Sequence, residues 1–104
     1  MVAYRWCEAA ETGMELERSE IYFSGRVQGV GFRYTTLRMA SNYDVTGFVK
    51  NLPDGRVLLV AEGRRDEVDS FVSSVQREMA ENIVSCDSSH SDYLGEFDGF
   101  QIVH

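Results

Sequence analysis

A short turn near the middle of the chain restricts the fold more than any other feature. The segment Leu52-Pro53-Asp54-Gly55 separates two strand-like segments, residues 45–51 and 56–62. Proline presets the backbone angle at the second position of a turn, and Asp-Gly accepts the conformations that follow it. The two segments therefore predict a β-hairpin. Because a hairpin makes neighbouring strands antiparallel, it excludes a purely parallel wound sheet.

The remaining periodicities place one helix on each side of this hairpin. Apolar residues recur at helical spacing from Phe32 to Tyr43 and again from Val68 to Met79. Strand-like segments begin near residues 21, 83 and 100. The order β-α-β-β-α-β with a short C-terminal strand predicts an α+β, ferredoxin-like sandwich. Its sheet would be mostly antiparallel, with both helices on one face.

The length predicts a single domain with an N-terminal extension. A chain of 104 residues can build one core. Residues 1–18 show neither helical nor strand periodicity, so we expect them to lie outside a fold that spans residues 19–104. Asp44 follows the first helical stripe and is expected to end that helix in a left-handed conformation.

Charge and cysteine content narrow the classes of partner. The net charge of −7 and the pI near 4.7 argue against nucleic acid or an anionic membrane. No apolar run approaches the roughly 18 residues of a membrane span. Cys7 and Cys86 lack the spacing of a disulfide framework or a zinc site. We therefore expect a cytoplasmic monomer without a metal or other cofactor.

A glycine-rich segment follows the first predicted strand and is the strongest candidate for a functional site. It reads Gly25-Arg-Val-Gln-Gly-Val-Gly-Phe-Arg33. Between a strand and a helix, successive backbone N–H groups and the positive helix end favour an anion. Arg33 could add its five-donor guanidinium. The segment matches neither a Walker loop nor a dinucleotide fingerprint, and an ordinary tight turn between strand and helix is the alternative.

The full string Gly25–Tyr34, followed by Gly47–Arg56, resembles the two signature stretches of the acylphosphatase family. Gly99-Phe-Gln-Ile102 is similar to the C-terminal strand of that family, and the resemblance covers about residues 19–103. It implies the ferredoxin-like fold and hydrolysis of the carboxyl-phosphate bond of small acyl phosphates to carboxylate and inorganic phosphate. It also implies two catalytic residues, Arg33 and Asn51, of which Asn51 orients the attacking water. The implied phosphate-binding residues are Arg26, Val27, Gln28, Gly29, Val30 and Arg33.

The implied reaction makes modest chemical demands. The leaving group is a carboxylate, which is already stable at pH 7, so positioning and charge stabilisation are sufficient and no general acid is needed. Accordingly, His90 and His104 have no partner at catalytic spacing and are expected on the solvated surface.

Three alternatives remain open from the sequence. From its pattern alone, Asn51 could be a turn residue that caps the hairpin. The chain could be a non-catalytic anion-binding module. It could also resemble the carbamoyl-phosphate-handling module of hydrogenase-maturation proteins, although it lacks the large extra domains and zinc-finger cysteines of those proteins.

Overall fold

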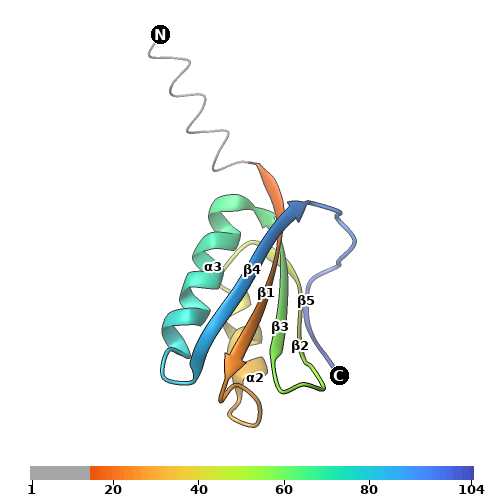
Figure 1. Cartoon of the computed structure of the whole chain (residues 1–104). Helices are drawn as coiled ribbons and strands as arrows, with labels where there is room; N and C mark the ends of the chain where they lie inside the picture. The colour runs from red at the N-terminus through yellow and green to blue at the C-terminus, as the bar shows by residue number, and fades with distance from the viewer. Residues whose placement is uncertain (1–14) are drawn as a thin grey trace.

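The computed structural model describes residues 15–104 and shows five strands in one sheet, with two helices on one of its faces (Figure 1). The strand order is β4-β1-β3-β2-β5, and every neighbouring pair is antiparallel except β2 and β5. The predicted α+β, ferredoxin-like class is therefore confirmed. The elements are β1 (Leu16–Gly25), α2 (Phe32–Ala40), β2 (Val45–Asn51), β3 (Val57–Arg64), α3 (Arg65–Glu78), β4 (Ile83–Asp92) and β5 (Phe100–Val103).

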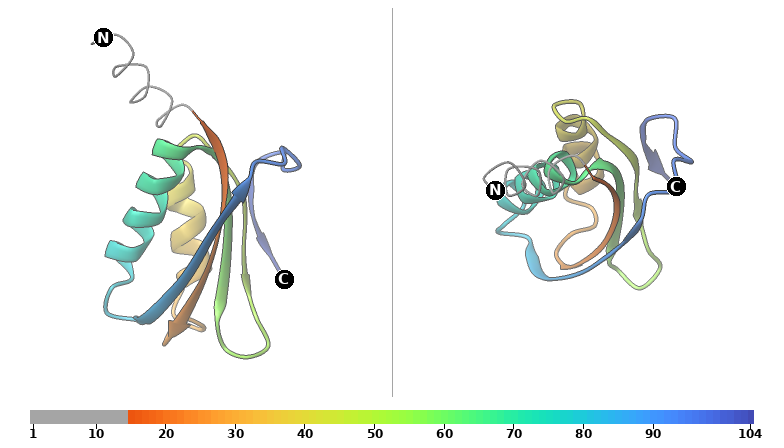
Figure 2. Two further views of the ribbon diagram at one scale, coloured as in Figure 1. Left: turned by 45° about the horizontal axis from the view of Figure 1, so that its top comes forward. Right: turned by 90° about the horizontal axis from the view of Figure 1, so that it is seen from above.

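The core lies between the sheet and the two helices (Figure 2). Alternate side chains of the central strands point toward the helices, because successive residues of a strand face opposite sides of the sheet. Phe23, Val49 and Leu59 are fully buried on this face. Phe32 from α2 and Phe71 from α3 close the core from the other side. This packing fixes the end of α2 that faces the β1–α2 loop.

The first helix is shorter than its apolar stripe predicts. It ends at Ala40 rather than near Tyr43, although the Tyr43 ring still packs 5.9 Å from that of Phe71. The expectation of a left-handed Asp44 is wrong, because no described residue other than glycine has a positive φ. The Asp44 N–H instead donates to Glu67 Oε1 at 2.7 Å. The chain therefore leaves α2 through a turn that is stabilised by the Glu67 side chain of α3, and not through a residue in the left-handed conformation.

The N-terminal boundary also differs from the expectation. Strand β1 begins at Leu16, so residues 16–18 belong to the sheet and not to an extension outside the fold. The sequence pattern did not reveal the true start of the strand, because the buried residue Glu17 is acidic and interrupts the apolar alternation. Its carboxylate accepts a hydrogen bond from Arg65 Nε at 3.0 Å, which compensates for burial. The rest of the expected extension falls mainly on residues 1–14, which lie outside the described residues.

A buried carboxylate fastens the β4–β5 connection to the sheet face that is opposite the helices (Figure 2). Glu62 on β3 has no exposed surface. It accepts hydrogen bonds at 3.0 Å from the backbone N–H groups of Leu94 and Gly95, and one at 3.1 Å from Arg18 Nη1. The connection leads directly into β5, so Glu62 contributes to the placement of the last strand.

We predict that Glu62→Ala lowers the free energy of unfolding by about 3 kcal/mol, because Arg18 and two backbone N–H groups lose a buried partner. Glu96→Ala is the matched control, since exposed Glu96 also pairs with Arg18, at 3.2 Å. We expect it to cost about 0.5 kcal/mol. Urea denaturation of both variants measures the difference, and equal losses would contradict the assigned role of Glu62.

Candidate active site

A small hollow forms where the β1–α2 loop, the first turn of α2 and the end of β2 meet. Its volume is about 100 Å³. Segments far apart in the sequence contribute to it because the hairpin turn, the β1–α2 loop and the end of β5 lie at the same end of the sheet (Figure 1). The residues that line it are Val27, Gly29, Gly31, Phe32, Arg33, Tyr34 and Asn51.

Two glycines give the loop its path around this hollow. Gly29 and Gly31 have φ values of +75° and +81°. A Cβ atom at either position would meet nothing within 4 Å, so the requirement for glycine is the left-handed backbone and not space. Val27, which has no exposed surface, anchors the loop in the core. The loop is therefore held at one residue and turned sharply at two others.

The backbone amides of this loop are suited to an anion. Within the described part of the chain, the N–H groups of residues 27–31 donate to no backbone carbonyl. Helix α2 begins directly after Gly31, and no side chain caps its N-terminus. The first N–H groups of a helix have no partner within the helix and carry its positive end. Loop and helix together therefore offer several donors to one anion.

Two residues of the expected phosphate loop have other roles in this structure. The Arg26 N–H donates to the Asn82 carbonyl at 2.9 Å, so, contrary to the expectation, this amide is engaged within the fold. The Gln28 Nε2 donates to the carbonyls of Leu52 and Arg56, at 2.8 and 2.9 Å. The Gln28 side chain therefore ties the loop to the hairpin turn. Val30, 40% exposed, is not among the residues that line the hollow.

Arg33 and Asn51, the two residues implied by the family resemblance, both line the hollow. Arg33 lies in the first turn of α2, and Asn51 is the last residue of β2. The Asn51 Oδ1 atom is buried and has no hydrogen-bond partner among the described residues. Buried acceptors are nearly always paired, so this oxygen requires an explanation.

His104 is the residue near the site that sequence reasoning missed. It is exposed as expected, but its Nδ1 lies 3.4 Å from Arg33 Nη1. The two residues are 71 positions apart. Only the parallel pairing of β5 with β2 brings them together, and no local pattern predicts this pairing. His90 is also exposed and contacts Glu17 at 3.1 Å in another part of the sheet.

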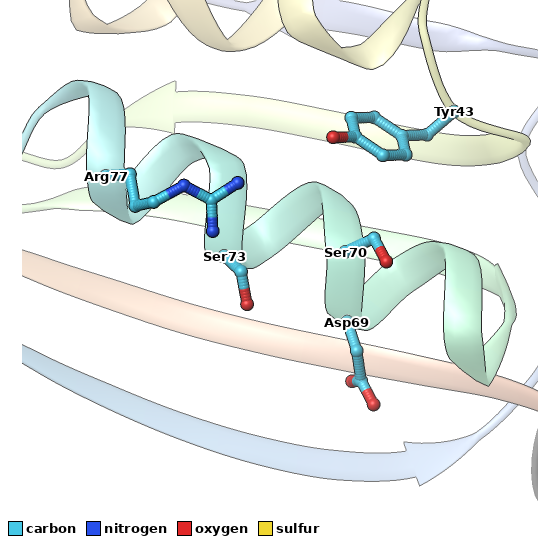
Figure 3. A pocket seen from close by; sticks show the side chains of 5 residues that line it. All are labelled: Tyr43, Asp69, Ser70, Ser73 and Arg77. Carbon is cyan, nitrogen blue, oxygen red and sulfur yellow. The ribbon is translucent and has the colours of Figure 1, made fainter.

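A larger hollow, of about 450 Å³, lies over α3 and is less suited to the chemistry (Figure 3). Its side chains do not converge on one point: Arg77 and Asp69 lie at separate places along the helix. Arg77 Nη2 donates to Ser74 Oγ at 3.3 Å, and the Tyr43 hydroxyl bonds to the same oxygen. An anion there would also meet the Asp69 carboxylate. The smaller hollow is therefore the better candidate.

Residues 15–104 contain no group of three or more His, Cys, Asp or Glu side chains arranged to hold a metal ion. In the same range, no helix has the length and apolar character needed to cross a membrane.

Comparison with known proteins identifies relatives of this chain. An acylphosphatase from Archaeoglobus fulgidus is 56% identical over 57 residues, which is 55% of this chain and 64% of that protein, just under two thirds of its length. An acylphosphatase from Syntrophus aciditrophicus is 40% identical over 90 residues, which is 86% of this chain and 94% of that protein.

Solved structures extend this similarity to the fold. The crystal structure of an acylphosphatase from Bacillus subtilis superposes with a TM-score of 0.75 at 34% identity, covering 85% of this chain and 99% of that one. Full-length HypF, in a phosphate- and nucleotide-bound form, matches 86% of this chain with only 12% of its own, at a TM-score of 0.72 and 28% identity. The acylphosphatase family model matches residues 19–102. On this match, and on the similarity to the relative from Syntrophus aciditrophicus, the chain belongs to the acylphosphatase family.

Proposed function

We propose that this protein hydrolyses small acyl phosphates to a carboxylate and inorganic phosphate, the activity of its family. The loop amides and Arg33 bind the phosphoryl group, and Asn51 orients the attacking water. The observation that carries the assignment of roles is the unpaired, buried Oδ1 of Asn51, in the same hollow as Arg33. A residue that only capped the hairpin would use this oxygen within the turn.

The reaction can proceed with these groups alone. Water oxygen attacks phosphorus, the bond from phosphorus to the carboxyl oxygen breaks, and the electron pair leaves on the carboxylate. The proton lost by the water goes to a phosphate oxygen of the substrate. Asn51 cannot act as a base, because an amide does not take up a proton at neutral pH. Its carbonyl oxygen can nevertheless hold one hydrogen of the water in line with the breaking bond.

Charge stabilisation falls to Arg33 and the backbone. Negative charge on the phosphoryl oxygens is met by a guanidinium and by preorganised N–H groups, which need no reorganisation during the reaction. We therefore expect turnover without added metal. We also expect the protein to be an active monomer, and we place it in the cytoplasm.

The direct test is release of phosphate from acetyl phosphate by the full chain, with a chelator present. Rapid release supports both the reaction class and its independence of metal. No release, or release restored only by a divalent cation, would contradict the proposal.

The likeness to HypF supports a second candidate, a carbamoyl-phosphate-handling module. Carbamoyl phosphate and acetyl phosphate assayed side by side distinguish the two. A strong preference for carbamoyl phosphate favours the second candidate, and similar rates favour a general acylphosphatase.

We predict that Arg33→Ala lowers the turnover rate by about 10²- to 10³-fold, because a preorganised cationic donor to the phosphoryl group is lost. Inhibition by inorganic phosphate should weaken as well. Arg38→Ala, an exposed arginine on the same helix, is the matched control and should retain wild-type activity. Similar activities of the two variants, with circular dichroism showing intact folds, would contradict the role of Arg33.

For Asn51→Ala, we predict a strong loss of kcat with nearly unchanged inhibition by phosphate, because Arg33 and the amides still bind the anion. Asn42→Ala, at an exposed position after α2, serves as the control. Steady-state kinetics and phosphate inhibition are measured together. Equal losses in rate and in phosphate affinity would place Asn51 in contact with the phosphoryl group instead of the water.

A third variant, Gln28→Leu, should lower kcat/KM by roughly ten-fold or more while the secondary structure is kept. The substitution preserves volume but removes both hydrogen bonds that join the loop to the hairpin, and small displacements of reacting groups are costly to rate. Gln76→Leu on α3 is the control, since Gln76 is also partly exposed and its amide contacts Cys86 on β4 instead of the hairpin. Unchanged kinetics in Gln28→Leu would show that the loop holds its position without this side chain.

A further inference from the structure

The hollow at Arg33 and Asn51 is large enough for a phosphoryl group but not for a whole acyl phosphate. Its volume is about 100 Å³. This is the volume of roughly three water molecules, since one occupies about 30 Å³ in the liquid. A phosphoryl group fills such a space. The acyl group of the proposed substrate must therefore lie outside the hollow, against the residues at its rim.

The direction of the acyl group follows from the proposed position of the water. In phosphoryl transfer, the attacking and leaving oxygens lie roughly in line through phosphorus. With the water held at Asn51, the leaving carboxylate points away from the hairpin. The other residues that line the hollow all come from the β1–α2 loop and the first turn of α2. The acyl group therefore extends toward this loop and this turn.

Two exposed apolar side chains lie on these segments. Tyr34 lines the hollow and is 66% exposed, so it borders both the hollow and the solvent. Val30 is 40% exposed and lies between Gly29 and Gly31, which both line the hollow. Single exposed apolar residues are common on protein surfaces, so the evidence here is their position and not their exposure. The other large apolar side chains that are exposed among residues 15–104 lie elsewhere: Leu16, Val84, Tyr93 and Leu94.

The chemistry of these two side chains suits an apolar partner. The tyrosine ring is a large contact surface with only two side-chain torsions, so contact costs it little conformational freedom. Valine has a single torsion and is stiff for the same reason. The segment from residue 26 to residue 40 contains no Asp or Glu. An apolar chain that crosses this rim therefore displaces water from Val30 and Tyr34 without covering a carboxylate.

From these observations we infer that Val30 and Tyr34 form an acyl-binding rim, through which the protein prefers acyl phosphates with an extended apolar acyl group. The inference rests on the proposed function. The two side chains contact the acyl group and not the reacting atoms. They set the specificity, whereas Arg33, the loop amides and Asn51 act on the phosphoryl group and the water.

The test compares acetyl phosphate with butyryl phosphate, which has two more CH₂ groups and a carboxylate leaving group of nearly equal basicity. A fully buried CH₂ group strengthens binding about four-fold, and one that touches protein on one side only gains about two-fold. We therefore expect kcat/KM for butyryl phosphate to be roughly four-fold that for acetyl phosphate. The gain should appear in KM, because the chain makes the same contacts before and during the reaction.

The double variant Val30→Ser/Tyr34→Ser should reduce this ratio to about one. The matched control is Val84→Ser/Tyr93→Ser, which makes the same exchanges at exposed positions outside the loop and α2, and it should keep the wild-type ratio. Both substrates are measured on one preparation, so the ratio does not depend on the fraction of protein that is folded. A ratio near one in the wild type, or an unchanged ratio in Val30→Ser/Tyr34→Ser, would overturn the inference.

Succinyl phosphate tests the apolar character of the rim. It has the same chain length as butyryl phosphate but ends in a carboxylate, which loses water on apolar contact. We expect its kcat/KM to be lower than that of butyryl phosphate. A higher value would overturn the inference, because the exposed cations Arg26 and Arg38 would then decide the preference.

A binding measurement separates this inference from the proposed function. Methylphosphonate and butylphosphonate are not hydrolysed, and they place an alkyl chain directly on phosphorus. In titrations followed by the amide resonances of the ¹⁵N-labelled protein, butylphosphonate should bind roughly eight-fold more tightly, at about two-fold for each of three further CH₂ groups. The Val30→Ser/Tyr34→Ser variant should bind both alike. Absence of hydrolysis in the wild type would contradict the proposed function alone, whereas equal affinities of the wild type for the two phosphonates would overturn the acyl-binding rim.

Discussion

Two hydrogen bonds from a single amide group hold the two halves of the proposed active site together. Gln28 Nε2 donates to the carbonyls of Leu52 and Arg56, which flank the hairpin turn. The loop that carries Gln28 leads into α2 and Arg33, and the hairpin carries Asn51. The distance between the proposed phosphate-binding cation and the proposed water-binding amide therefore depends on this clamp. The core packing of Val27 prevents the loop from moving away on its other side.

A protein with a net charge of −7 nevertheless has a hollow suited to an anion. The placement of the ion pairs explains how a negative net charge is compatible with a hollow suited to an anion. Carboxylates with cationic partners are kept away from the hollow: Glu62 binds Arg18, and Glu17 binds Arg65. Asp54 lies on the hairpin turn near the site. Its carboxyl accepts hydrogen bonds from Arg56, and the bond from the Arg56 backbone N–H is the main reason that the pKa of this carboxyl is lowered. The Asp54 carboxylate is therefore paired with Arg56 and not with Arg33. The guanidinium of Arg33 remains available to the proposed substrate.

Local sequence patterns predicted most of the fold and the loop at the centre of the candidate site. The Leu-Pro-Asp-Gly turn predicted the hairpin, and the glycine-rich segment predicted a loop whose backbone needs a left-handed φ at Gly29 and Gly31. These features depend on neighbouring residues, so a sequence reveals them. Arg33 and Asn51 were identified by the family resemblance, and the structure places both at one hollow.

The features that were missed depend on contacts between distant parts of the chain. Residues 16–18 were placed outside the fold because a charged Glu17 breaks the apolar alternation of β1, and only Arg65 on another element makes its burial acceptable. The Arg26 amide is engaged by Asn82, which belongs to the segment after α3. His104 reaches Arg33 only through the parallel pairing of β5 with β2. No local pattern predicts these partners.

The central claim is that a single site, formed by the loop amides and Arg33, binds the phosphoryl group. Titration of the ¹⁵N-labelled protein with inorganic phosphate, with chloride at equal ionic strength as the control, tests it residue by residue. The account predicts saturable shifts in the amide resonances of residues 27–34 and in Arg33 Nε–H, with little change at Arg26, whose N–H is already engaged. Shifts centred on Ser73 and Arg77 over α3, or no saturable shift in the loop, would contradict it.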